Sequence, residues 1–260
     1  MPTHFIPKII TDSDLQTEYF HELSVGNIPA IIFPKILDKR ECDDLSAKIL
    51  SSKEISVGLG STEKIGESLN SYISNKFEYF KKSKSSNGVL KKMFSYTDPR
   101  EKMLAKISTS CGKKIQFARE KSRSYSRGII RLHQPGTMIH IHRDNASFEA
   151  SNFSVSELSG QLSATLHLQS AESGGTLCIF DKFWTKADEK HRKPVFGYSK
   201  KAIKKVSQTS ISCNQGDLVL INPKKYHSVN AIKGKLTRIT FGFFFAYDRH
   251  CNLFLSLIHI

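Results

Sequence analysis

The sequence predicts one mainly β domain of 260 residues with supporting helices in its N-terminal half. Two observations carry this prediction. From about residue 127 onward, short apolar runs of strand length alternate with Gly, Pro and Asn turn signals. Before them stand segments that begin with helix-capping residues. No linker-like stretch divides the chain, which is long enough for one sizeable core.

Residues 1–126 are predicted to form the helical support, as part of the same domain. Their capping residues and apolar runs give the expected elements in order. These are a helix capped by Asp12 or Ser13 and reaching about Leu23, a strand over 28–33, a helix from Asp38 to Leu50, a helix from Thr62 to Phe80, and a helix from Asp98 and Pro99 to about Ser110.

The β part begins with a strand, a Pro-Gly turn and a second strand over 128–142. Further strands are expected over 161–169, after the Gly174-Gly175 pair, over 218–221, around His227 and over 239–247. Between 182 and 206 lies a basic insert that is longer than most connections within a domain.

Three metal-ligating residues stand at strand ends. His142 and Asp144 are two residues apart, so at a strand end both project from the same face. His227 lies on a distant strand, beyond the break at Asn222 and Pro223. Two imidazoles and one carboxylate on one face of an octahedral ion leave positions open, as in non-haem Fe(II) oxygenases. His142, Asp144 and His227 are therefore the predicted metal ligands.

Arg238 and Thr240 form another pair two residues apart, within an apolar strand. A guanidinium in a buried strand needs an anionic partner. A carboxylate can accept two hydrogen bonds from the arginine and one from the threonine hydroxyl. Taken alone, Arg238 could equally lie at the strand end in solvent, but its spacing from His227 favours the anion site.

With these residues the chain resembles the 2-oxoglutarate/Fe(II)-dependent oxygenase superfamily, over about 127–247. The shared pattern is His-x-Asp, a distant His, then Arg-x-Thr, matched by His142, Asp144, His227, Arg238 and Thr240. The resemblance implies a double-stranded β-helix core (jelly roll, cupin-like) over 127–254. It also implies Fe(II), with 2-oxoglutarate and O2 as co-substrates and ascorbate as a reductant.

Two branches of the superfamily are similar to this chain. His133 and Gly136, ahead of His142, resemble the frame of prolyl-hydroxylase-type enzymes, with His133 where a 2-oxoglutarate-binding Tyr would stand. The wider layout is more similar to free-standing small-molecule hydroxylases and carrier-independent halogenases. A halogenase of that group has Gly or Ala at the position of Asp144, which leaves room for chloride on iron.

Because Asp144 fills that position, the resemblance implies hydroxylation, or a related C–H oxidation, of a small molecule such as an amino acid or natural-product intermediate. Two alternatives stay open at this point. One is a peptide or protein hydroxylase of prolyl type, and the other is a non-catalytic cupin-like metal-binding module.

The substrate pocket is the least determined part of the site. Candidate contacts are His140, Asn145 and Trp184. The 182–206 insert is a candidate lid that could bring Trp184, Phe196 and Tyr198 to the substrate, or it is a surface excursion. We assign His167 to a packed, hydrogen-bonded position without a role in the reaction, although it alternates with Ser163, Thr165 and Gln169 on a strand face that could line a cavity.

The formal charge of +15 raises the question of nucleic-acid binding. The basic clusters are separate in sequence, mostly lysine, and poor in interleaved aromatics. We therefore expect a solvated surface or an attraction for anionic substrates, and no nucleic-acid partner.

The N-terminal residues lack the features of a signal peptide, and no apolar run approaches membrane-spanning length, which predicts a cytoplasmic protein without a membrane partner. Five widely spaced cysteines indicate neither a disulfide framework nor a zinc knuckle. The oligomeric state is not predicted. Residues 255–260 resemble the translation of a sequencing adapter, so their deletion is expected to leave turnover unchanged.

Overall fold

The computed structural model describes residues 5–11, 16–58, 62–247 and 253–256. Its largest element, the major sheet, has ten strands and is mostly antiparallel. The main path runs β1 (Lys8–Ile9), β2 (Ala30–Phe33), β14 (Leu218–Ile221), β10 (Ser159–Gln169), β17 (Arg238–Tyr247), β8 (Ile129–His133), β4 (Glu63–Ile65) and β3 (Ser56–Val57). Off this path, β18 (Leu253–Ser256) pairs with β17 and with β5 (Ile115–Phe117).

A second sheet, the minor sheet, has four antiparallel strands. Their order is β13 (Gln208–Ile211), β12 (Leu177–Phe183), β15 (Lys225–Val229) and β9 (Ile139–His142). Two small ribbons pair β11 (Ser173–Gly174) with β16 (Ile232–Lys233) and β6 (Arg119–Glu120) with β7 (Arg123–Ser124). The predicted turn at Pro135 and Gly136 thus joins β8 and β9, which belong to different sheets.

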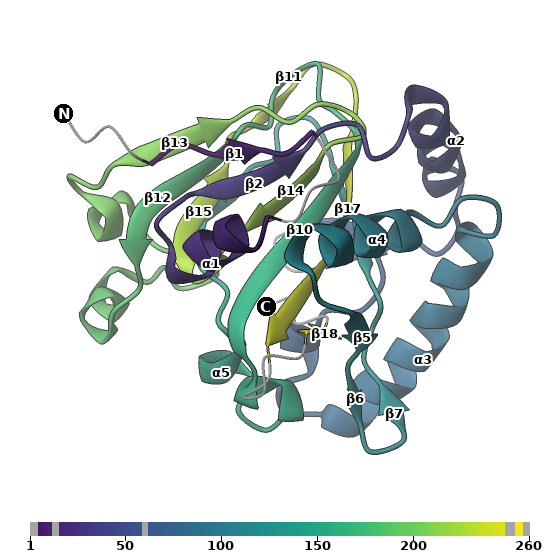
Figure 1. The fold of residues 1–260 in the computed structure, drawn as a ribbon, viewed down its shortest axis with the longest axis horizontal. Helices are drawn as coiled ribbons and strands as arrows, with labels where there is room; N and C mark the ends of the chain where they lie inside the picture. Colours follow the sequence, from purple (N-terminus) through teal and green to yellow (C-terminus); the bar gives the residue numbers. More distant parts are fainter. Residues whose placement is uncertain (1–4, 12–15, 59–61, 248–252, 257–260) are drawn as a thin grey trace.

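The helices are α1 (Thr17–Val25), α2 (Lys39–Leu50), α3 (Lys76–Met93), α4 (Pro99–Cys111) and α5 (Ala146–Glu149), with 3-10 turns η2 (Leu69–Tyr72), η3 (Ser154–Glu157), η4 (Lys186–His191) and η5 (Lys200–Ile203). Figure 1 shows α2, α3 and α4 beyond β10 and β17, with β12, β13 and β15 of the minor sheet on the opposite side. Within the described ranges no helix is long and apolar enough to cross a membrane.

Because side chains alternate along each strand, the two faces of the major sheet have different surroundings. On β17, Ile239, Phe241, Phe243 and Phe245 are buried in the main hydrophobic core, together with residues of α1 to α4. Their neighbours Arg238, Thr240 and Phe244 face the other way, into a cavity. The N-terminal helices contribute apolar residues to this core, among them Leu23, Leu45, Leu90 and Ile107.

Most of the predicted helices are confirmed. Asp38 caps α2 with a full capping box, in which its side chain accepts from the Glu41 backbone N–H and the Glu41 carboxylate accepts from the Asp38 N–H. Asp98 caps α4, with Pro99 in its first turn. The first helix begins at Thr17, and the predicted caps Asp12 and Ser13 lie outside the described residues.

The helix predicted from Thr62 to Phe80 is wrong. Glu63, Lys64 and Ile65 instead form β4, which pairs with β8 at the edge of the major sheet. Gly66 follows with a φ of 118°, and a Cβ there would lie 2.6 Å from the Gly128 carbonyl oxygen. Pairing with β8 overrides the local helix preference, and the true helix α3 begins only at Lys76, after the Asn75 cap.

Loss of the α2 cap should be measurable. Asp38→Ala is expected to lower the free energy of unfolding by about 1 kcal/mol, because an orphan backbone N–H of the first turn loses its acceptor. Chemical denaturation would measure the difference. Asp43→Ala on the same helix is the control, since Asp43 is exposed and does not cap the helix; equal loss in both variants would contradict the capping role.

Candidate metal centre and co-substrate pocket

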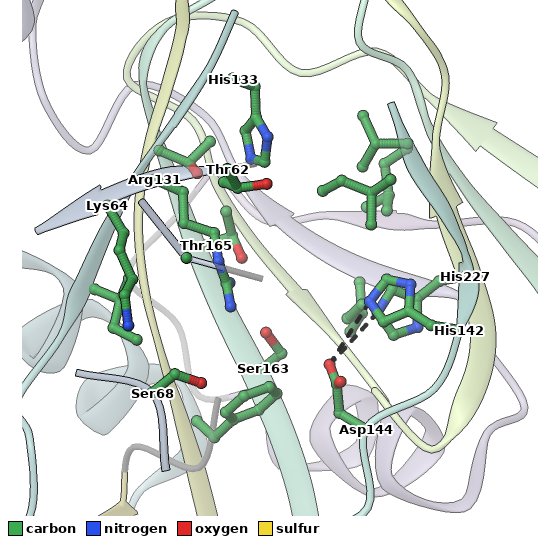
Figure 2. Close-up of a pocket in the computed structure, with 18 of the residues that line it drawn as sticks. Thr62, Lys64, Ser68, Arg131, His133, His142, Asp144, Ser163, Thr165 and His227 are labelled. Atoms are coloured by element: carbon green, nitrogen blue, oxygen red, sulfur yellow. Dashed lines mark ion pairs between the residues drawn. The ribbon is translucent and has the colours of Figure 1, made fainter. Parts of the chain in front are cut away.

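A cavity of about 180 Å³ lies between the two sheets. One wall comes from β8, β10, β14 and β17 of the major sheet, and the other from β9, β12 and β15 of the minor sheet. Figure 2 shows His142, Asp144 and His227 gathered on one side and Lys64, Arg131 and His133 on the other. The alternation described above therefore directs polar side chains from both sheets into one space.

The three predicted metal ligands meet on the minor-sheet side. His142 ends β9 and pairs directly with His227 on β15, which brings the two ring centroids to 4.1 Å. The Asp144 carboxylate lies 3.7 Å from Nε2 of His227 and 4.0 Å from Nε2 of His142. Asp144 is held there because its backbone N–H donates to the Pro223 carbonyl at 2.8 Å.

Backbone carbonyls fix the histidine tautomers. Nδ1 of His142 lies 2.8 Å from the His140 carbonyl oxygen, and Nδ1 of His227 lies 2.9 Å from that of Lys225. In each ring the N–H is therefore on Nδ1, and Nε2 presents its lone pair toward the shared centre. Burial lowers the pKa of both imidazoles to about 4, so both are neutral near pH 7.

The donor set fits a ferrous ion. Two neutral imidazoles and one carboxylate offer ligand atoms that all lie within 4.8 Å of one another. Burial raises the pKa of Asp144 to about 6, which remains below neutral pH, so this carboxylate is ionised there. The facial arrangement leaves the cavity side open for further ligands.

The residues predicted to bind 2-oxoglutarate line the same cavity. Arg238 and Thr240 are each 5% exposed, and His133 pairs with Arg238 across β8 and β17. Burial lowers the pKa of Arg238 to about 10, and no hydrogen bond or carboxylate within the described ranges offsets that effect. His133 is neutral, because burial and the nearby Arg238 and Arg131 charges lower its pKa to about 3. The site thus presents an unpaired buried cation.

Three predicted substrate contacts lie away from this cavity. His140 is exposed, and only its carbonyl serves the site, through His142. Asn145 accepts a hydrogen bond from Ser147 at the start of α5. The indole of Trp184 donates to Glu189 and stacks on Phe148 and on the Arg143 guanidinium. None of the three side chains lines this cavity, and the role of His140, Asn145 and Trp184 as substrate contacts stays a prediction.

The 182–206 insert contributes one aromatic to the cavity. Phe196 lines it, with its ring centroid 5.1 Å from that of His142. The insert is hydrogen-bonded to β9, since the Tyr198 N–H donates to the Ile141 carbonyl at 2.7 Å. The approach is close enough to require glycine at 197, because a Cβ there would lie 2.4 Å from the same oxygen. Tyr198 itself packs on Tyr226, away from the cavity. Only the Phe196 segment therefore covers the metal side.

Further residues line the cavity. Ser163, Thr165 and His167 face it from β10, on the strand face whose alternation allowed this, whereas Gln169 bonds to the Thr237 carbonyl instead. Arg131 and Lys64 were not singled out at all, yet both line the cavity. The available signal was the alternation on β8, where Ile130 and Leu132 enter the core and Arg131 must face the opposite side.

The buried histidines should make stability depend on pH. Burial holds the pKa of His167 well below its ordinary value of 6.5, so the unfolded chain binds a proton that the folded chain excludes. The stability contributed by the neutral ring is therefore present above about pH 6.5 and is lost as the pH falls. For metal-free protein, the difference in unfolding free energy between wild type and His167→Gln should shrink by about 1.4 kcal/mol per pH unit below that value. Parallel curves from denaturation at several pH values would contradict the burial effect.

Comparison with known proteins agrees with this geometry. The family model described as "Carrier-protein-independent halogenase WelO5" matches residues 8–254. The leucinostatins biosynthesis cluster protein S of Purpureocillium lilacinum is 29% identical over 154 residues, which is 57% of this chain. The match spans 62% of that relative's length.

Solved structures share the fold. An N-substituted L-amino acid dioxygenase from Burkholderia ambifaria AMMD superposes with a TM-score of 0.63 and 20% identity, covering 92% of this chain and 91% of that one. HygX from Streptomyces hygroscopicus, solved with nickel and 2-oxoglutarate, gives 0.53 and 11% identity, covering 89% and 87%. Since the family model covers nearly the whole chain, the protein belongs to the WelO5 family of Fe(II)- and 2-oxoglutarate-dependent enzymes.

Proposed function

We propose that this enzyme is a dioxygenase that hydroxylates a small molecule, or carries out a related C–H oxidation, with a double-stranded β-helix as its core. His142, Asp144 and His227 are the proposed iron ligands. Arg238, Thr240 and His133 are the proposed 2-oxoglutarate-binding residues. The observation that carries the proposal is the position of the Asp144 carboxylate, within 4.0 Å of both imidazole Nε2 atoms.

Each group has a defined task in this proposal. When bound, iron activates O2, with 2-oxoglutarate oxidised to succinate and CO2 and one oxygen atom inserted into a substrate C–H bond. Arg238 holds the distal carboxylate of 2-oxoglutarate through charge-assisted hydrogen bonds, and the Thr240 hydroxyl adds one more. Phe196 limits the access of water to the metal side. The polypeptide supplies orientation and a dry pocket.

Asp144 favours hydroxylation over halogenation in a family named for a halogenase. A halide could bind the metal only in a position that the protein leaves free. Here a carboxylate that is 7% exposed fills the third protein position. Its negative charge would also repel a halide at close range. Oxygen insertion is therefore the reaction that this ligand set supports.

The limited volume of the cavity favours a small substrate over a peptide chain. Its volume is about 180 Å³, and Phe196 partly covers the metal side. An extended peptide would need an open groove. The similar Burkholderia fold belongs to an enzyme of N-substituted L-amino acids, so amino-acid derivatives are the first substrate class to test.

The reaction is tested by succinate formation. Protein reconstituted anaerobically with Fe(II) and 2-oxoglutarate, then exposed to O2, is expected to form succinate slowly without substrate and faster with it. Omission of 2-oxoglutarate is the control. If the protein binds neither Fe(II) nor 2-oxoglutarate in equilibrium dialysis, the proposed function is wrong.

The role of Phe196 gives a separate prediction. Phe196→Ala opens the metal side to water, so we expect substrate-free succinate formation to rise while the share of turnover coupled to product falls by roughly tenfold. Val195→Ala, a change at the neighbouring 91% exposed residue, is the matched control. An unchanged ratio of product to succinate in Phe196→Ala would exclude Phe196 from this role.

A further inference from the structure

Two cations face each other at the edge of the major sheet. Lys64 on β4 and Arg131 on β8 are direct cross-strand partners, and Arg131 in turn pairs with Thr240 on β17. Both cationic side chains line the cavity. Figure 2 shows them on the wall opposite the metal-binding side chains. Like charges directly opposite each other destabilise a sheet, so an anion bound beside them would be stabilising.

Lys64 already has an acidic neighbour. Its Nζ lies 3.7 Å from the Glu67 carboxylate, which also accepts a hydrogen bond from the Tyr72 hydroxyl. Arg131 has no such neighbour. Within the described ranges its guanidinium has no hydrogen bond, and the one carboxylate whose charge it feels, that of Asp144, is not in ion-pair contact with it. Burial lowers the pKa of Arg131, as expected for a desolvated cation without an ion pair.

The charges around the cavity leave Arg131 unmatched even with the cofactors of the proposed function in place. Fe(II) and the 2-oxoglutarate dianion have equal and opposite charges. Lys64, Arg131 and Arg238 carry three positive charges. Two carboxylates stand against them, that of Glu67 beside Lys64 and that of Asp144, which is not in ion-pair contact with Arg131. As metal ligands, His142 and His227 would bind in their neutral form. One positive charge therefore remains on the half-buried cavity wall, and a charge withdrawn from water is normally paired.

We propose that Arg131, supported by Lys64, binds a carboxylate of the substrate on the cavity wall opposite the metal ligands. This inference rests on the proposed function, because it assigns Arg238 rather than Arg131 to 2-oxoglutarate. The guanidinium fork matches a carboxylate with two parallel hydrogen bonds. A single unmatched charge fits a carboxylate better than a phosphate, which carries up to about two charges near pH 7.

The position of this subsite has a consequence for selectivity. A carboxylate held at Arg131 would fix one end of the substrate on the major-sheet wall. The remainder would then extend across the cavity toward His142 and His227, under Phe196. Substrates without the anion would lose their anchor, so the position oxidised is set by its distance from the carboxylate.

Acetate serves as the probe, with acetamide as its neutral isostere and inorganic phosphate as the competing anion. Thermal unfolding is followed at constant chloride for metal-free protein and for protein loaded with Ni(II) and 2-oxoglutarate. Arg131→Met removes the charge, and Arg131→Lys keeps it without the fork. The matched control is Arg127→Met, since Arg127 stacks on the Phe117 ring and does not line the cavity. Affinity for 2-oxoglutarate is measured on each variant.

We expect acetate, and not acetamide, to raise the unfolding temperature of wild type and of Arg127→Met. Arg131→Met should bind acetate roughly 10- to 100-fold more weakly, with Arg131→Lys in between. Without acetate it should be no less stable than wild type, because a desolvated charge without an ion pair is gone. Its affinity for 2-oxoglutarate should stay within about threefold of wild type.

The opposite results overturn the inference in distinguishable ways. No acetate response in wild type, or the same response in Arg131→Met, would exclude a carboxylate site at Arg131. A stronger response to phosphate would assign a phosphorylated ligand instead. Loss of 2-oxoglutarate binding in Arg131→Met would place this residue in the co-substrate clamp. Failure of wild type to bind metal and 2-oxoglutarate would refute the proposed function, while the acetate response of metal-free protein would still decide the subsite.

Discussion

Asp144→Ala is expected to abolish substrate hydroxylation and to weaken Fe(II) binding by roughly a hundredfold or more. Even changes next to metal ligands cost 10- to 100-fold in affinity, and here a ligand itself is lost. The remaining pair, His142 and His227, would hold the metal by two neutral imidazoles alone. Anaerobic equilibrium dialysis measures the affinity, and product formation at saturating Fe(II) measures the turnover.

The unfolding temperature distinguishes the loss of the proposed metal ligand from a loss of folded structure. In metal-free protein the Asp144 carboxylate is buried, and desolvation raises its pKa to about 6. Removing it should therefore leave the unfolding temperature unchanged or higher. Asp144→Asn is the matched variant, which keeps the shape but loses the charge. Hydroxylation by Asp144→Ala at wild-type rate would refute the ligand assignment.

Asp144→Ala also tests whether this chain can halogenate a substrate once the carboxylate is removed. Alanine at 144 vacates one metal position, and chloride can then compete for it. A chlorinated product would show that the carboxylate is the main barrier to halogenation in this chain. Loss of both reactions would show that a halide needs further groups around position 144.

The sequence predicted best the groups whose chemistry and spacing are both local. His142 and Asp144 are two residues apart at a strand end, as Arg238 and Thr240 are within a strand, and the structure places all four around one cavity. Confirmed helices such as α2 likewise have local causes, since the Asp38 cap lies within one turn of the residues it serves.

The failures share a tertiary cause. Lys64 fell inside the helix predicted from Thr62, so its place beside Arg131 could not be seen. The error came from long-range pairing, because only contact with β8 makes 63–65 a strand. The position of Trp184 has a similar cause, since it packs on Arg143 and Phe148 and does not line the cavity. Interactions between distant segments decide these cases, and no local pattern encodes them.

Arg238→Met is expected to raise the KM for 2-oxoglutarate by roughly 30- to 4000-fold. The loss of one partner from a buried charge pair costs about 2–5 kcal/mol, and about 1.4 kcal/mol corresponds to a factor of ten. A carboxylate of 2-oxoglutarate would then face the neutral His133 side chain and the Thr240 hydroxyl. His133, the cross-strand partner of position 238, has no positive charge to replace that of Arg238. Succinate formation at increasing 2-oxoglutarate measures the change.

Two readouts make the result specific. Fe(II) affinity should be unaltered, because Arg238 contacts none of the three proposed ligands, and metal-free Arg238→Met should be at least as stable as wild type, since an unpaired buried cation is removed. Arg131→Met is the matched variant. It has the same substitution on the neighbouring strand β8, where Arg131 pairs with Thr240 of β17. A normal KM in Arg238→Met beside a raised KM in Arg131→Met would exchange the two roles: the carboxylate subsite would then lie on β17, and the co-substrate would bind nearer to Lys64. The two arginines are thus distinguished by which variant changes the dependence of turnover on 2-oxoglutarate, and not by loss of activity alone.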